Sequence, residues 1–272
     1  MIERFHGHLK LECGIDEFRR TRIERQSVKA PFHISKPYWD GKVLTIQVVN
    51  PTAGLFSGDV LESDLSVTTG AKVLMTTPSA SRVHISRGGS AHVIQRFHVG
   101  NNGWLEYSPS MLMPQAGSLY RQVSEVYVEY GGDLFFMEML APGRVARGEY
   151  FKFKELDWTF NLHYDQKLIC RERFVLEPNE DSCYALQNPI PNAWFAGGYI
   201  VSSRLSDSKG VLEQLRSLND EHIRVGISRL YDYCWTVRLL ACNGILMRKT
   251  ISTLRELLSG ILPELKTKCR VV

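Results

Sequence analysis

An alternation of apolar and polar side chains with a period of two, interrupted by glycine turns, runs from about residue 20 to about residue 205 and constrains the fold more than any other feature. Between residues 91 and 99, for example, Val93, Phe97 and Val99 share one face of an extended chain, and polar residues occupy the other. Recurrent strands with short turns and hardly any helical period predict an all-β architecture.

Glycine-rich segments between these stretches predict tight turns. Gly-Asn-Asn-Gly at 100–103 predicts a hairpin turn into residues 104–107, because Asn-Gly tolerates positive φ. A second turn is expected at 131–133, before the apolar run at 134–140. We therefore expect mainly antiparallel strands.

Helical periodicity appears only in the C-terminal third, at residues 208–219 and 250–261. Thr253 and Glu256 would form a capping box if the second helix started there rather than earlier. No flexible linker splits the chain. We expect one large β domain over residues 1–272 with about two α-helices.

Composition argues against several classes of protein. The formal charge of +4 is mild, and the basic cluster at 19–22 is too short for the stripe that a nucleic-acid surface needs. No stretch approaches the roughly 20 apolar residues of a membrane helix, and residues 1–8 lack the apolar core of a signal peptide. We expect a cytoplasmic protein that binds neither nucleic acid nor membrane.

The six cysteines are scattered and form no Cys-x-x-Cys pair, so a structural zinc site is not expected. We expect reduced thiols at all six positions, which are Cys13, Cys170, Cys183, Cys234, Cys242 and Cys269.

Standard catalytic signatures are absent from the sequence. The glycine turn at 54–58 is not followed by Lys-Ser/Thr, so it is not a phosphate loop, and neither Gly-x-Ser-x-Gly nor His-Glu-x-x-His occurs. The pairs His6/His8 and His92/His98 contain possible metal ligands, but we favour a polar strand face, which explains them without a ligand. No metal site is assigned.

The segment at 50–59, Asn-Pro-Thr-Ala-Gly-Leu-Phe-Ser-Gly-Asp, predicts a tight and non-repetitive turn between two strands. Gly54 and Gly58 can take backbone angles that a Cβ forbids. The turn holds Asp59 at the start of the next strand, where functional side chains are often found.

A second carboxylate, Glu138, stands in the apolar run Phe-Met-Glu-Met-Leu at 136–140, which makes burial plausible. A buried carboxylate is costly unless it is paired or hydrogen-bonded. Arg144 is one candidate partner, and a purely structural ion pair is the alternative interpretation.

Three motifs occur together at 50–59, at 74–82 (Leu-Met-Thr-Thr-Pro-Ser-Ala-Ser-Arg) and at 142–149 (Pro-Gly-Arg-Val-Ala-Arg-Gly-Glu). In their order and spacing they resemble the urease accessory protein UreD family, called UreH in some bacteria. The similarity extends from about residue 20 to about residue 265.

The resemblance implies a mostly β protein that is not an enzyme but a cytosolic scaffold for nickel insertion into urease. It implies binding of the accessory protein UreF, which with the GTPase UreG forms a complex that docks on urease apoprotein. Nickel would pass through an internal water-filled route, so the resemblance implies transient nickel and no tightly bound cofactor.

Five residues carry the resemblance at the level of a site. Asp59, Glu138 and Arg144 match positions that would line the route or support it, and Gly54 and Gly58 match the motif turn. One alternative is a β-rich hydrolase that uses Asp59 and Glu138 as an acid/base pair on a sugar or ester. Another is a non-catalytic protein-binding β module.

Overall fold

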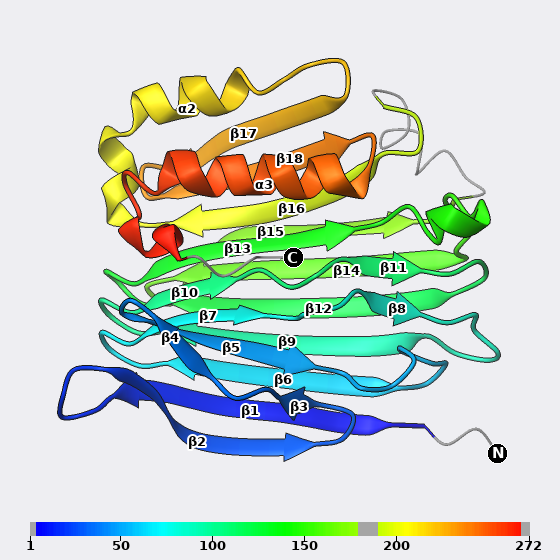
Figure 1. The fold of residues 1–272 in the computed structure, drawn as a ribbon, viewed down its shortest axis with the longest axis horizontal. Helices are drawn as coiled ribbons and strands as arrows, with labels where there is room; N and C mark the ends of the chain where they lie inside the picture. The colour runs from blue at the N-terminus through cyan, green and yellow to red at the C-terminus, as the bar shows by residue number, and fades with distance from the viewer. Residues whose placement is uncertain (1–3, 179–189, 268–272) are drawn as a thin grey trace.

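The computed structural model describes residues 4–178 and 190–267, which form two facing β-sheets with helices on one outer side (Figure 1). The seven-stranded sheet contains, in spatial order, β15 (Lys167–Leu176), β14 (Glu155–Tyr164), β12 (Leu119–Val128), β9 (Ala91–Val99), β6 (Val60–Val67), β1 (His6–Ile15) and β2 (Thr21–Lys29). The 11-stranded sheet contains β17 (Ile223–Tyr231), β18 (Cys234–Ala241), β16 (Trp194–Val201), β13 (Asp133–Leu140), β10 (Trp104–Tyr107), β7 (Lys72–Thr76), β5 (Val43–Val49) and β3 (His33–Ile34), with β4 (Tyr38–Asp40), β8 (Ser81–Val83) and β11 (Leu112–Pro114) beside that path.

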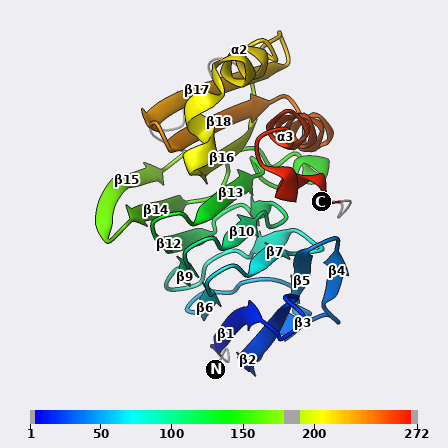
Figure 2. The same cartoon turned by 90° about the vertical axis from the view of Figure 1, so that its left-hand side faces the viewer.

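The centre of the molecule is a parallel coil. Strands β1, β6, β9, β12 and β14 are parallel neighbours in one sheet, and β5, β7, β10 and β13 are parallel neighbours in the other. The chain passes from one sheet to the other as it moves along the stack (Figure 2). Val60 of β6 is therefore the neighbour of His92 of β9, and His92 is the neighbour of Arg121 of β12. The prediction of mainly antiparallel strands is therefore wrong.

The turn at 100–103 illustrates the error. The turn itself forms, because Gly103 N donates to Gly100 O at 2.9 Å and Asn102 has a φ of 54°. The strands that it joins, β9 and β10, lie in different sheets and do not pair. Asn102 N donates instead to Gly131 O of the next coil at 3.1 Å, so the turn is a corner of the coil and not a hairpin.

Antiparallel strands close the two ends of the stack. Strand β2 pairs with β1 at one end, and β15, β16, β18 and β17 extend the sheets at the other. These strands cover edges that the parallel coils would otherwise leave unpaired. The apolar faces of the two sheets pack together around Leu65, Phe97, Val126 and Phe136.

Both expected helices form, with different bounds. The helix expected at 208–219 is α2 (Lys209–Arg216), and the one expected at 250–261 is α3 (Gly244–Leu258), which begins earlier. Asn243 caps α3 by accepting a hydrogen bond from Leu246 N at 2.8 Å, so the capping box at Thr253 does not form. Within residues 4–178 and 190–267, the short 3₁₀ helices are η1 (Val145–Arg147), η3 (Ser203–Asp207) and η4 (Pro263–Lys266).

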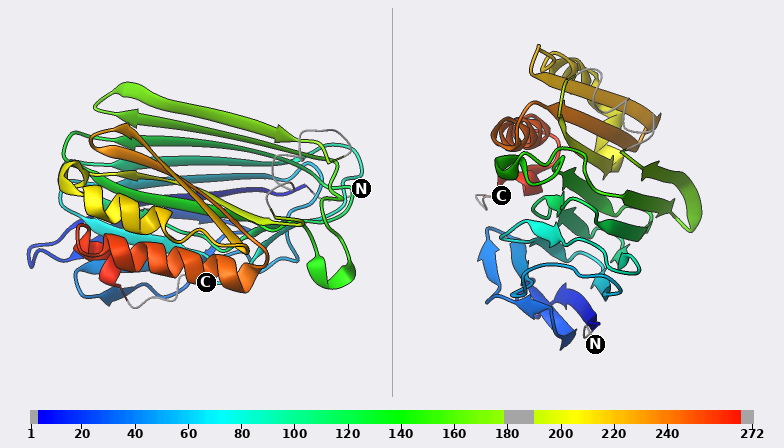
Figure 3. Two further views of the ribbon diagram at one scale, coloured as in Figure 1. Left: turned by 90° about the horizontal axis from the view of Figure 1, so that it is seen from above. Right: turned by 90° about the vertical axis from the view of Figure 1, so that its right-hand side faces the viewer.

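Helices α2 and α3 lie on the same outer side of the 11-stranded sheet (Figure 3). A buried ion pair fixes α3 there. Arg255 donates from Nε to Glu106 Oε1 at 2.8 Å and from an Nη to Oε2 at 3.1 Å. Glu106 on β10 has no exposed surface, and Arg255 also donates to Thr267 Oγ1. The pair joins the C-terminal helix to the middle of the coil.

The described cysteines Cys13, Cys170, Cys234 and Cys242 are free thiols, and Cys183 and Cys269 lie outside the described residues. No group of three or more His, Cys, Asp or Glu side chains in residues 4–178 and 190–267 could hold a metal ion. Across the same ranges, no helix combines the length and the apolar character that a membrane span requires.

Candidate functional site

The three sequence motifs gather at one end of the coil, on the right in Figure 1. The first motif links β5 to β6, the second runs from within β7 into β8, and the third follows β13 and contains η1. Leu55 of the first motif forms a β-bridge with Val83, next to the second motif, and β8 pairs with β11. The corner turns at 100–103 and 131–132 lie at the other end of the strands.

Gly54 permits the contact between the first two motifs. Its φ is 140°, and a Cβ placed on it would lie 2.4 Å from the carbonyl oxygen of Arg82. That same oxygen accepts a hydrogen bond from Leu55 N at 2.8 Å. Gly58 has a φ of 82° and packs against the Arg4 side chain. The turn needs glycine at both positions for steric and conformational reasons.

Replacing Gly54 with alanine is expected to lower the free energy of unfolding by about 1–3 kcal/mol, because the backbone must strain or separate from Arg82. Gly210→Ala in α2 is a matched control, since no atom lies within 4 Å of its would-be Cβ. Urea titration of both variants measures the difference. Equal stability of the two variants would contradict this account of the turn.

Asp59 lies at the closing end of the turn and is 2% exposed. Its carboxylate accepts hydrogen bonds from Phe5 N at 3.0 Å and from Phe56 N at 2.8 Å. Asp59 therefore fastens the turn to the segment before β1. It does not line either of the two cavities described below.

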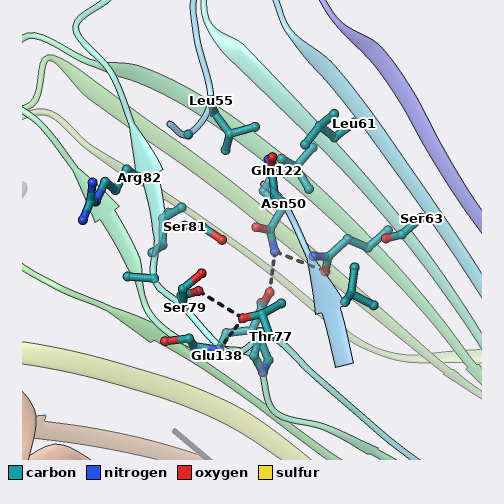
Figure 4. A pocket seen from close by; sticks show the side chains of 18 of the residues that line it. Asn50, Leu55, Leu61, Ser63, Thr77, Ser79, Ser81, Arg82, Gln122 and Glu138 are labelled. Carbon is teal, nitrogen blue, oxygen red and sulfur yellow. Dashed lines mark hydrogen bonds between the residues drawn. The ribbon is translucent and has the colours of Figure 1, made fainter. Parts of the chain in front are cut away.

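A cavity of about 340 Å³ opens between the sheets beside the first two motifs (Figure 4). Polar side chains from both sheets and from the motif loops line it, including Asn50, Ser63, Thr77, Gln95, Gln122 and Glu138. Glu138 is the one acid among the described residues that line this cavity, and Arg82 on β8 is the one base. A roomy cavity with this many polar groups suits water and small polar solutes.

Glu138 on β13 is 9% exposed and takes part in a buried hydrogen-bond network. Gln122 Nε2, on the facing sheet, donates to Glu138 Oε1 at 2.8 Å. The same amide group contacts Ser124 and Gln95, and Gln95 donates to the Tyr107 hydroxyl at 2.8 Å. Burial raises the pKa of Glu138 to about 8, against the opposing effect of hydrogen bonds with Gln122 and Trp158.

Arg144 does not pair with Glu138. It forms an ion pair with Glu149, with Nε 2.8 Å from Oε2, and Glu149 also accepts a hydrogen bond from Ala116 N. Hydrogen bonding to Arg144 lowers the pKa of Glu149. Arg144 thus stabilises the loop of the third motif. Its position fits a structural role.

A smaller cavity of about 30 Å³ adjoins the first, and Glu138 and Trp158 line both. On its other side lie Glu172, Tyr199 and Arg238. Tyr199 and Arg238 both donate hydrogen bonds to Glu172. Burial opposes ionisation of Glu172, but these two hydrogen bonds outweigh it and lower its pKa.

Sequence reasoning missed Gln122 and Glu172. A signal for Glu172 was available, because it alternates with Cys170 and Phe174 on the inward face of β15. Gln122 had a weaker one, a polar residue at an inward position of β12. The pattern could not reveal that either residue is a neighbour of Glu138 across the sandwich.

The histidines considered as metal ligands have ordinary partners. His6 contacts Glu62 at 3.0 Å, His8 contacts Ser27 at 2.8 Å and His92 contacts Ser90 at 2.8 Å. The remaining one, His98, stacks on Tyr127 with ring centroids 4.8 Å apart. These are the hydrogen-bond and stacking contacts expected of a polar strand face.

Comparison with known proteins identifies the family. The family described as UreD urease accessory protein matches residues 6–270. Urease accessory protein UreD of Opitutus terrae is 37% identical over 265 residues, covering 96% of this chain and 97% of that protein. UreD of Acetivibrio thermocellus is 26% identical over 88% of this chain and 92% of that protein, and UreH of Helicobacter hepaticus is 25% identical over 66% and 69%. The chain belongs to the UreD family of urease accessory proteins, whose role is in urease maturation.

Proposed function

We propose that this chain binds a UreF-like accessory protein and, together with a UreG-like GTPase, docks on urease apoprotein and passes nickel towards its active site. Membership of the UreD family supports a role in urease maturation as an accessory protein rather than as a catalyst. The observation that carries the nickel step is the pair of adjoining cavities between the sheets, with Glu138 lining both.

The lining of these cavities suits a cation in transit. A conduit must attract a cation enough to admit it and bind it weakly enough to release it. Hydroxyl and amide oxygens with one buried carboxylate meet both needs, whereas a closed His/Cys cage would retain nickel. Among the described residues, no group of three such ligands exists that could form a cage.

The position of Asp59 disfavours the hydrolase alternative. An acid/base pair requires two carboxyl groups that reach one substrate. The Asp59 carboxylate already accepts hydrogen bonds from two backbone amides, one from Phe56 in its own turn and one from Phe5 before β1. Of the two carboxyl groups, only that of Glu138 belongs to a residue that lines one of these cavities.

Co-expression of the full chain with a UreF-like protein is expected to give a complex that co-purifies through affinity and size-exclusion steps. The same UreF-like protein co-expressed with an unrelated β-sandwich is the control for non-specific capture. Two folded proteins that elute separately would contradict the scaffold role. A complex that also recruits the UreG-like GTPase and urease apoprotein would extend the scaffold role to these partners.

A further inference from the structure

Glu138 is shared by the two cavities. Glu138 and Trp158 line both the cavity of about 340 Å³ and the one of about 30 Å³. The smaller cavity has room for about two or three water molecules, which is less than the octahedral water shell of a small divalent cation. A cation that moves between the cavities must therefore exchange water for protein oxygen beside Glu138.

The charged and titratable groups facing Glu138 do not compensate a negative charge there. Tyr107 on β10 and Tyr120 on β12 are phenols whose pKa is raised by burial and by the Glu138 carboxyl itself, so both are neutral. Across the smaller cavity, Arg238 on β18 is paired with Glu172 on β15. That pair is neutral as a whole.

The remaining neighbours of Glu138 are uncharged. Gln122 on β12 donates to its Oε1 at 2.8 Å, Trp158 on β14 is its other hydrogen-bond partner, and Gly197 lies opposite it on β16. Arg82 on β8 is exposed. At neutral pH a buried carboxyl among neutral groups is therefore more stable protonated than ionised.

We propose that Glu138 is a site of cation–proton exchange, at which a divalent cation binds only as the carboxyl group gives up its proton. The O–H bond breaks, a carboxylate oxygen coordinates the cation, and the proton leaves through the water of the larger cavity. When the cation moves on, a proton returns from that water, and no electron is transferred. The inference rests on the proposed nickel route and adds the step that loads and unloads it.

Exchange of this kind makes the empty site neutral and selects for divalent ions. A monovalent cation gains less from one carboxylate than a divalent cation does, so it competes less well with the proton. The pKa of about 8 places this competition near neutral pH. Loading should therefore rise as pH increases towards that value.

Calorimetric titration of the full chain with Ni²⁺, repeated in buffers of different ionisation enthalpy, measures the protons released on binding. At pH 7 the parent chain is expected to release about one more proton per bound nickel than Glu138→Gln. Glu256→Gln, at an exposed position on α3, is the control and should match the parent. Equal proton release by the parent and Glu138→Gln overturns the proposal.

The pH dependence of unfolding gives a second readout that does not require nickel. The pKa of Glu138 is raised in the folded chain, so its stabilising contribution is complete below the ordinary value of 4.5 and is lost as pH rises through about 8. The parent's unfolding free energy should fall over that window relative to Glu138→Gln. Parallel curves for the two proteins overturn the proposal.

Urease activation in cells separates this inference from the function on which it rests. Loss of activation by Glu138→Gln with unchanged proton release would contradict the exchange and leave the nickel route standing. Full activation by a variant that has lost the proton release would contradict the route through Glu138. We expect Glu138→Gln to lose both urease activation and the extra proton release.

Discussion

Replacing Glu138 with glutamine is expected to lower nickel-dependent urease activation by about tenfold or more, because one charge-assisted ligand interaction is worth about 1.5–3 kcal/mol. Glu138 is the one acid among the described residues that line the larger cavity, and it also lines the smaller one. Glutamine keeps the size of the side chain and can still accept a hydrogen bond from Gln122. The variant should therefore fold and assemble while passing nickel poorly.

The measurement is urease activity in cells that carry the variant in place of the parent chain, at several nickel concentrations. Co-purification with the UreF-like partner checks assembly, and Glu256→Gln is again the control. Asp59→Ala provides a contrast, because loss of the carboxylate that accepts from Phe5 and Phe56 should lower the midpoint of thermal unfolding. Normal activation by Glu138→Gln at limiting nickel would rule out its role in the route.

Replacing Arg255 with alanine is expected to lower the free energy of unfolding by about 3–5 kcal/mol, because the change leaves a buried carboxylate without its cation. Glu106 has no exposed surface, and burial already raises its pKa against the effect of Arg255. The helix α3 should detach from β10 more easily in this variant. Urea unfolding followed by circular dichroism measures the loss.

Two further variants define the cause of that loss. Lys249→Ala removes an exposed cation from the same helix and should change stability by less than about 0.5 kcal/mol. The double replacement of Glu106 and Arg255 by leucine and methionine should recover much of the stability, because no charge is then left buried. A single variant Arg255→Ala as stable as Lys249→Ala would show that the ion pair does not fix α3.

The alternation of side chains identified the strands but not their partners. Residues 91–99 form β9, with Phe97 and Val99 buried as the pattern predicts. The pattern is the same for parallel and antiparallel neighbours, because successive side chains point to opposite faces in both. The pairing depends on whether the chain returns to the same sheet or enters the other sheet after each turn. The Gly-Asn-Asn-Gly turn at 100–103 is compatible with a hairpin and with a corner between sheets.

The residues at the site differ in how far local sequence could predict them. The positive φ angles of Gly54 and Gly58 could be predicted, because glycine itself allows them. The burial of Glu138 could also be predicted, from its apolar neighbours in the sequence. The role of Asp59 in its turn and the pairing of Arg144 with Glu149 depend on loop geometry that no pattern specifies. Glu138 contacts Gln122 of β12 and shares a cavity with Glu172 of β15. Both relations depend on how the two sheets are stacked.

The nickel content of urease purified from cells that lack this chain tests the central claim most directly. We predict urease with little nickel and low activity in those cells, restored by the parent chain and not by Glu138→Gln. Urease with a full complement of nickel in the absence of the chain would contradict the account.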